Sequence, residues 1–520
     1  MNKWRALCLG LLSIAVWECS ACRHEKKNNI FPDVADSSIV RGRTLSKIYC
    51  QSCHLLPDPS LADAKTWVNG ILPLMGPRLG IFRHNNINYH SYIYDRNLPR
   101  GFYPRKPVLS SNDWQRIIDY YSAVSPDILP AQKRDQRIEK ELPFFKLVKP
   151  QGNFSVPATT FVKIDSVNHK SAIIIADGVQ KNLTIYNSRL EKTDSLHFEG
   201  PIVDLIHKQD SGWLACDIGV FNPNNGKFGK LISLSIKDSG KMISNNPIWD
   251  SLERPVYVME ADLNQDGKKD YLVCEYGNLL GALSWLQNMG NGRFERHVLK
   301  AEPGAIRTVI NDYNHDGLPD IWCLFAQGDE RIILFTNRGS GKFEQDLLLR
   351  FPPIYGSSYF ELDDFNKDGF PDILYTCGDN ADGSGVLKPY HGLYIFLNDG
   401  KNHFTQKYFF AADGCYKAIA KDFDGDGELD IASIAFFSDF KNQPEESFVL
   451  LMGQGNLRFK PYSFPEAGQG RWLTMDVGDA NGDGKPDILL GNYSIAPGFI
   501  KEHPDWKLQP PFFLLKNIHP

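Results

Sequence analysis

The chain has 520 residues, which is long enough for more than one domain. With 42% hydrophobic and 23% charged residues, its composition is that of an ordinary soluble globular protein. The net charge of −5 and the pI near 6.2 argue against a nucleic-acid partner, which would require a strongly basic surface.

The first 21 residues have the pattern of a secretory signal peptide. Lys3 and Arg5 precede an apolar stretch, residues 6–17, that is too short to span a bilayer. The small residues ahead of Cys22 resemble a bacterial lipobox, which implies that Cys22 is the lipidated first residue of the mature protein. Cys19 departs from the Leu or Val usual at its position, and an ordinary cleaved signal peptide is the alternative.

Residues 22–38 are polar and irregular, and they are predicted to be a tether between the lipid and the folded protein. A protein with these features belongs in the bacterial cell envelope, with a lipid anchor as its only membrane attachment. The residues after Cys22 lack an acidic cluster that would indicate display on the cell surface. A periplasm-facing position is therefore favoured over the cell surface.

A short motif follows a predicted helical turn at residues 45–49. Cys50 and Cys53 are three residues apart and His54 follows at once, a spacing that lets two thiols attach to the haem vinyl groups while the imidazole binds the iron. A thiol redox pair would need a βαβ context, and a zinc site would need a second Cys pair nearby; the sequence has neither. The motif predicts one covalent haem c, which export also suits, because haem is attached outside the cytoplasm.

Residues 39–130 resemble a class I cytochrome c. The resemblance depends on the motif at 50–54 and on the segments 55–59 and 71–76. It implies a small all-α domain whose last helix packs against the first. That last helix is predicted to start at Ser110, with a cap at 111–113, and its apolar face consists of Trp114, Ile117, Ile118 and Tyr121.

The sixth iron ligand has three candidates. Met75 is the only methionine between the signal peptide and the linker, and a thioether ligand would favour Fe(II). Met75 follows His54 by only 21 residues, which is short for the family resembled, and His84 and His90 are the alternatives, which would give a bis-His haem of lower potential. We predict Met75, and a methionine that only fills the core is the competing interpretation.

Residues 131–144 are predicted to be a linker. Up to residue 141 they are rich in Lys, Arg, Asp and Glu and have little apolar character. This composition favours a linker or a short solvated helix, and a functional charge patch is the weaker interpretation.

Five acidic nine-residue loops recur in residues 145–520. In one copy Asp422, Asp424, Asp426 and Asp430 occupy positions one, three, five and nine, and Gly427 allows a sharp turn at position six. Oxygen ligands in this pattern can surround one Ca²⁺, although the Glu at position twelve of an EF-hand is absent. The other copies are Asp262, Asn264, Asp266 and Asp270; Asp312, Asn314, Asp316 and Asp320; Asp364, Asn366, Asp368 and Asp372; and Asp479, Asn481, Asp483 and Asp487.

The loops recur every 50 to 58 residues, and each precedes short strands with a Gly-rich turn and a Phe. This pattern is typical of propeller blades, and it resembles the FG-GAP/VCBS repeats of integrin-α-type β-propellers. Two degenerate repeats, at 161–178 and 202–219, lack the loop carboxylates and are not expected to bind Ca²⁺. The repeats therefore predict seven blades and up to five structural Ca²⁺ ions. The segments 144–148 and 512–515 are expected to share the last blade, which would hide its edge.

Four cysteines lie 11 to 13 residues after the first Asp of their repeats: Cys216, Cys274, Cys323 and Cys377. Equivalent positions on successive strands are core positions, so these residues are predicted to be buried thiols rather than disulfides or catalytic groups.

The chain is thus predicted to be a multidomain protein, with a small all-α cytochrome c domain followed by an all-β seven-bladed propeller. Signatures of zinc proteases, serine hydrolases and P-loop NTPases are absent from the sequence, and no catalytic residue is predicted. The favoured function is an electron carrier that serves a redox partner protein, with the propeller as a docking or binding platform. The alternatives are an oxidoreductase whose haem accepts electrons from a substrate at the propeller, and a propeller that binds a glycan or a protein without turnover.

Overall fold

The computed structural model describes residues 34–165, 171–208, 212–237, 241–381, 385–498, 500 and 503–520. The predicted signal peptide and the predicted lipidation site Cys22 lie outside the described residues, as does most of the predicted tether 22–38. Within the described ranges, no helix combines the length and the apolar character that crossing a bilayer requires.

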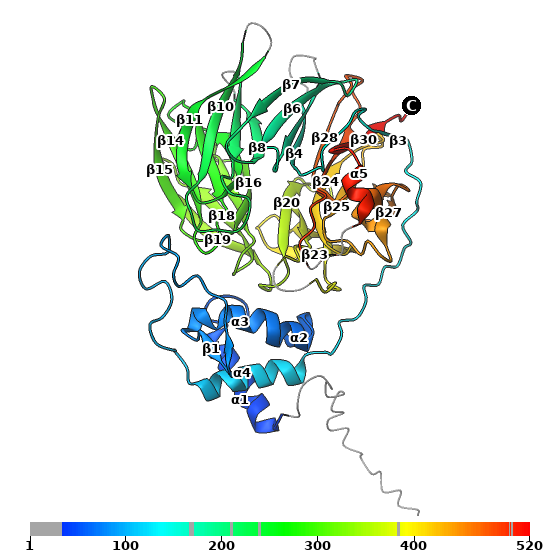
Figure 1. Cartoon of the computed structure of the whole chain (residues 1–520). Helices are drawn as coiled ribbons and strands as arrows, with labels where there is room; N and C mark the ends of the chain where they lie inside the picture. The colour runs from blue at the N-terminus through cyan, green and yellow to red at the C-terminus, as the bar shows by residue number, and fades with distance from the viewer. Residues whose placement is uncertain are drawn as a thin grey trace, which may run out of the picture.

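Seven four-stranded antiparallel sheets surround a central axis and form a seven-bladed β-propeller (Figure 1). The first strands of neighbouring blades contact one another and line this axis. They are β4 (Thr159–Asp165), β8 (Ile202–His207), β12 (Pro255–Ala261), β16 (Ala305–Asn311), β20 (Ser357–Asp363), β24 (Cys415–Lys421) and β28 (Trp472–Gly478).

The second and third strands form the middle of each blade. The second strands are β5 (Ala172–Asp177), β9 (Trp213–Asp217), β13 (Asp270–Glu275), β17 (Asp320–Phe325), β21 (Asp372–Cys377), β25 (Asp430–Ala435) and β29 (Asp487–Asn492). The third strands are β6 (Asn182–Asn187), β10 (Gly229–Ile236), β14 (Ala282–Gly290), β18 (Arg331–Asn337), β22 (Gly392–Asn398), β26 (Phe448–Gly453) and β30 (Phe512–Asn517). Most second strands are buried along their whole length, because each blade is covered on both faces by its neighbours.

The outer strands are β7 (Lys192–His197), β11 (Met242–Leu252), β15 (Arg293–Lys300), β19 (Phe343–Arg350), β23 (Phe404–Ala411), β27 (Phe459–Tyr462) and, in the last blade, β3 (Phe145–Val148). Strand β3 pairs with β30 from the other end of the chain, with Phe145 opposite Asn517. This pairing confirms that the two ends of the propeller share one blade. It also covers the edge that β30 would otherwise expose.

Hydrophobic clusters fill the spaces between adjacent blades, and the predicted core thiols lie in them. Cys216, Cys274, Cys323 and Cys377 are fully buried and unpaired, which confirms that prediction. Cys415, which the sequence left unassigned, is also a buried free thiol at the start of β24.

Residues 34–130, hereafter the head, are mainly helical. Its elements are α1 (Asp36–Tyr49), η1 (Pro59–Leu61), α2 (Ala64–Thr66), η2 (Trp67–Ile71), α3 (Leu72–Met75), η3 (Pro77–Leu79) and α4 (Ser111–Val124), with a small antiparallel ladder of β1 (Arg83–His84) and β2 (Ile87–Asn88). The ladder was not predicted from the sequence, because two residues per strand leave no alternating pattern to detect.

Helices α1 and α4 pack against each other, as the sequence predicts. Their backbones are close at Gly42, where a Cβ would lie 1.9 Å from the carbonyl oxygen of Arg116. The hydroxyl of Ser110 accepts a hydrogen bond from the Asp113 N–H and caps α4. The predicted apolar face of α4 is buried, and Trp114 is fully inaccessible to solvent.

The predicted linker, residues 131–144, forms no helix and is not a free tether. It runs along the side of the propeller from α4 to β3 (Figure 1). Ile138 is buried in the cluster between β22 and β26, and Glu139 forms a parallel bridge with Tyr462 of β27. We call this segment the strap, because it is attached to the propeller over much of its length. Three further short helices, η5 (Pro444–Ser447), η6 (Ala467–Gln469) and α5 (Pro504–Leu508), lie in the loops of the last two blades.

Candidate functional site

The two thiols of the CxxCH motif lie where α1 ends. The backbone N–H of Cys50 still donates to Ser46 O at 2.9 Å, and Cys53 N–H then closes a turn onto Cys50 O at 3.3 Å. The thiols form no disulfide. Burial, and secondly the nearby Cys53, raise the pKa of Cys50 to about 11, so this thiol stays protonated at neutral pH.

The ring of His54 is held by its own backbone neighbour. Its Nδ1 lies 2.7 Å from the Leu55 carbonyl oxygen, which accepts the Nδ1 proton in the matching tautomer. In the part of the chain that the structure describes, no protein group bonds Nε2, so its lone pair is available to a metal. Cys50, Cys53 and His54 do not converge as a chelate, since the only convergent metal-ligand group among the described residues is in an acidic loop.

The three candidates for a sixth ligand differ in their surroundings. Met75 is half-buried at the end of α3 and packs against the core cluster of the head. His84 is buried, with Nε2 2.7 Å from Gln115 Oε1 and Nδ1 3.3 Å from Ser111 Oγ, so both ring nitrogens are engaged. His90 is exposed.

All five acidic loops connect the first strand of a blade to the second, and they therefore lie at the same end of the propeller. In every copy the N–H of the sixth residue donates to Oδ2 of the first Asp at 2.8–2.9 Å. The sixth-position glycine has a positive φ, for example +82° at Gly267, and no atom within 4 Å of an added Cβ. The turn therefore needs glycine for its backbone angle and not for space.

The ninth-position Asp of each loop is buried and connects the loop to its blade. Oδ1 accepts from a backbone N–H at the end of the third strand at 2.7–2.9 Å, for example Asn288 N–H to Asp270. Burial, opposed by these hydrogen bonds and reinforced by neighbouring loop carboxylates, raises the pKa of Asp372 and Asp487 to about 6 and of Asp430 to about 7. A cation in the loop would offset this repulsion.

Carboxylates converge most closely in the fourth loop. Single oxygens of Asp422, Asp424 and Asp426 all lie within 4.8 Å of one another. The other four loops have Asn at the third position, which supplies an oxygen without a charge. Carboxylate oxygens thus converge in the fourth loop, and all five loops share the same backbone hydrogen bonds to their first and ninth Asp, while Ca²⁺ binding stays a prediction.

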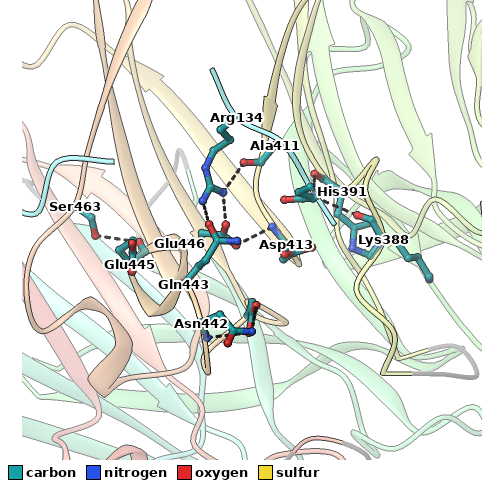
Figure 2. Close-up of polar contacts among 12 residues, drawn as sticks. Arg134, Lys388, His391, Ala411, Asp413, Asn442, Gln443, Glu445, Glu446 and Ser463 are labelled. Atoms are coloured by element: carbon teal, nitrogen blue, oxygen red, sulfur yellow. Dashed lines mark hydrogen bonds and ion pairs between the residues drawn. The ribbon is translucent and has the colours of Figure 1, made fainter. Parts of the chain in front are cut away.

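A buried polar cluster that was not predicted from the sequence attaches the strap to blades five and six (Figure 2). The guanidinium of Arg134 donates to Glu446, to Gln443 and, at 3.1 Å, to Ala411 O. The Asp413 N–H donates to the other oxygen of Glu446 at 3.1 Å. The strap is thus held by a cation that reaches into the propeller.

Two acidic groups in this cluster titrate far from their usual range. Burial, and secondly the carboxylates of Glu446 and Asp439, raise the pKa of Asp413 to about 8. Burial raises the pKa of Glu446 to about 7, against the opposing effect of Arg134. Nearby, His391 is fully buried, and burial lowers its pKa well below the ordinary value.

The head touches the propeller at the end opposite the acidic loops. The hydroxyl of Tyr390, ahead of β22, donates to Leu61 O of the head at 3.0 Å, and Ile354, ahead of β20, packs against the core of the head. Asn225, between β9 and β10, donates to Asp95 of the head at 2.8 Å. Leu61 is seven residues after His54, so this contact lies close in sequence to the CxxCH motif.

A family model described as an FG-GAP-like repeat matches residues 262–323, 312–375 and 364–433, which reach from the acidic loop of the third blade to that of the sixth. These blades carry FG-GAP-like repeats. The FG-GAP β-propeller is a scaffold suited to a binding platform, because its loops gather at two open faces.

Among solved structures, the chain is similar to the N-terminal domain of Nup159, with 10% identity over 74% of this chain and 99% of that chain and a TM-score of 0.41. It is also similar to BBS1N in complex with ARL6DN, with 8% identity over 73% of this chain and 98% of that chain and a TM-score of 0.45. A third similar structure is Saccharomyces cerevisiae Sqt1, with 8% identity over 69% and 95% and a TM-score of 0.41.

Proposed function

We propose that this protein is an exported c-type haem electron carrier, anchored by a lipid at Cys22, whose FG-GAP propeller is a docking platform. The observation that carries the proposal is the local geometry of the CxxCH motif. Its two thiols are free, they lie in a turn at the end of a helix, and His54 presents an unengaged Nε2. The close crossing of α1 and α4 at Gly42 supports the likeness of the head to a class I cytochrome c.

The residues present fit a covalent haem better than a chelated metal. Cys50 and Cys53 would hold the porphyrin by thioether bonds, which need separated thiols rather than convergent ones. His54 would ligate the iron through Nε2, with Leu55 O retaining the ring orientation. A bound haem would supply a one-electron Fe(III)/Fe(II) couple.

We assign Met75 as the sixth ligand. The engagement of both nitrogens of His84 supports this choice, because binding iron would cost that residue a hydrogen bond to Gln115 or Ser111. His90 would need to leave an exposed position on the β2 side of the head. Met75 is already half-buried against the core.

We further propose that the five loops bind Ca²⁺ with a structural role. The support is the convergence of loop oxygens and the raised pKa values of the buried ninth-position carboxylates. A divalent cation would neutralise each loop and stabilise the turn into the second strand of the blade. The loops are far along each blade from the head, so this role is separate from electron transfer.

The test of the haem proposal is expression with haem-attachment machinery, followed by a haem-stained gel and a pyridine haemochrome spectrum. The wild-type chain is expected to be coloured, with a spectrum of two thioether linkages. Cys50→Ala with Cys53→Ala should give a colourless protein, whereas the control Cys216→Ala, a core thiol, should remain coloured. A colourless wild type that is exported and folded would refute the proposal.

A further inference from the structure

One segment of the head has an unusual charge. Residues 83–106, hereafter the basic segment, contain five cations and a single acid, Asp95. The cations are Arg83, Arg96, Arg100, Arg105 and Lys106, and all five are exposed. The sign of the charge in this segment is therefore opposite to that of the whole chain, which has a net charge of −5.

The chain does not neutralise these cations itself. Among the described residues, no carboxylate lies within 4.0 Å of the charged nitrogens of Arg96, Arg100, Arg105 or Lys106. The only acid of the segment, Asp95, is used for the contact with the propeller, where it accepts from Asn225 at 2.8 Å. The propeller therefore contacts the one acidic residue of this segment through a neutral amide, and no described carboxylate pairs with these four cations.

Apolar side chains accompany the cations. Tyr94 is 95% exposed, and Ile93 is 46% exposed beside it. Ile87, within the segment, and Val108, two residues after it, are also exposed. Exposed aromatic and aliphatic side chains interspersed with arginines along one segment have the composition of a protein-binding surface, in which Tyr and Arg are the enriched residue types.

The chain at the end of the basic segment is attached to η3. The N–H of Val108, two residues after the segment, donates to Leu79 O at 3.0 Å, and η3 directly follows α3 with Met75. The guanidinium of Arg78 in η3 lies 4.7 Å from the ring centre of Phe102. Arg78 is three residues after Met75, so its contact with Phe102 places this part of the segment near the predicted sixth ligand.

We propose that the basic segment is the docking surface for an acidic partner protein, which presents carboxylates around an apolar centre. Where the head carries haem, as in the function proposed above, this partner is the redox partner. Four of the five cations are arginines, whose planar fork binds carboxylates bidentately. An anionic membrane is the poorer fit, because basic membrane anchors gather their cations on an amphipathic helix or in a short run. In this segment they are spread over an irregular loop with one short ladder.

The first test needs no haem. Fluorescence anisotropy would measure binding of labelled poly-L-glutamate to the full exported protein at low and at physiological ionic strength. The triple variant R96E, R100E and R105E is expected to bind about 10-fold or more weakly at low salt. The matched control K342E, K401E and K407E makes the same charge change at exposed propeller residues and should stay within about 2-fold of wild type.

Equal loss in both triple variants would show a response to net charge alone and would overturn the proposal. So would binding to vesicles containing phosphatidylglycerol without binding to poly-L-glutamate. The variant R96Q, R100Q and R105Q removes the three positive charges without adding negative ones. It should bind with intermediate strength, whereas misfolding would not produce such a graded response. Circular dichroism of all variants should be unchanged.

A second test reports on electron transfer. Oxidation of the reduced protein by ferricyanide, an anion, should slow in R96E, R100E and R105E, whereas oxidation by a cationic cobalt(III) complex should accelerate. The propeller control should change neither rate. If the protein has no haem, this test has no signal while the poly-L-glutamate result stands, so the two proposals fail separately.

Discussion

At the scale of single residues, the ability of a histidine to bind a metal depends on which ring nitrogen the fold leaves without a hydrogen bond. The Nδ1 of His54 is committed to Leu55 O, and this hydrogen bond leaves Nε2 as the acceptor atom. In His84, Gln115 accepts from Nε2–H and the Ser111 hydroxyl donates to Nδ1. The spacing of residues in the sequence could not have shown that both ring nitrogens of His84 are hydrogen-bonded, because its partners come from α4, about 30 residues away.

If Met75 is the sixth ligand of a bound haem as proposed, Met75→Ala is expected to abolish the methionine-to-iron charge-transfer band of the oxidised protein and to lower its reduction potential, because a thioether stabilises Fe(II). Absorption spectroscopy and potentiometry measure the two effects. The matched variant His84→Gln should keep the band. If the band survived in Met75→Ala, the ligand would have to be reassigned.

The buried carboxyl of Asp413 makes stability depend on pH. Its pKa is about 8 when folded and about 4 when unfolded, so the folded protein binds more protons between these values. This contribution to stability is full below about pH 4 and is lost as the pH rises through about 8. The groups that set this pKa are Glu446, Asp439 and Arg134.

Asp413→Asn is therefore expected to flatten the fall in the free energy of unfolding across that pH range, by up to about 1.4 kcal/mol per pH unit. Urea unfolding followed by tryptophan fluorescence at several pH values would measure the slope. The exposed control Asp505→Asn should leave the slope unchanged. An identical slope in wild type and Asp413→Asn would contradict the assignment.

At the scale of elements, the crossing of α1 and α4 depends on the absence of a side chain at one position. An added Cβ on Gly42 would also lie 2.7 Å from the Cβ of Tyr120, and both contacts involve atoms that cannot rotate away. The helices would have to separate, which would disturb the turn that presents Cys50.

Gly42→Ala is expected to destabilise the head by about 1–3 kcal/mol through overpacking, despite the better helix propensity of Ala. Denaturant unfolding of the full chain, followed by haem absorbance or by tryptophan fluorescence, would show an earlier transition for the head. Thr44→Ala, on the exposed face of the same helix, should be neutral or slightly stabilising. Equal effects of the two substitutions would show that the crossing is not tight.

The elements that the sequence predicted were those with a local signal. The apolar face of α4 follows from helical periodicity, and the acidic loops follow from ligand spacing. The first strand of each blade was harder to recognise, because it precedes the loop and the loop marks the conspicuous start of each repeat. The attachment of the strap had no local signal, since Arg134 and Glu446 are 312 residues apart.

At the scale of the whole molecule, one strand pairing closes the ring of blades, and separate long-range contacts hold the head against it. Strand β3 closes the last blade by antiparallel pairing with β30, as the sequence predicted from the leftover apolar segments at each end. The strap and the contacts of Tyr390 and Asn225 then hold the head at one face, while the acidic loops occupy the other. The number of blades could be predicted from the sequence. Which face of the propeller the head contacts could not, because it depends on these long-range contacts.

If the loops bind Ca²⁺ as proposed, removing calcium is expected to destabilise the propeller, without releasing the covalent haem proposed for the head. A site saturated at 100 times its Kd contributes about 2.7 kcal/mol, so chelation should lower the melting temperature by several degrees, and added Ca²⁺ should restore it. Differential scanning calorimetry with EGTA, Ca²⁺ and Mg²⁺ would measure this change in melting temperature.

Asp424→Asn converts the fourth loop to the composition of the other four and should weaken Ca²⁺ binding there with little change in the metal-free melting temperature. The exposed control Asp250→Asn, outside the loops, should respond to Ca²⁺ as the wild type does. A melting temperature indifferent to EGTA would mean that the hydrogen bonds of the ninth-position carboxylates hold the loops without a metal.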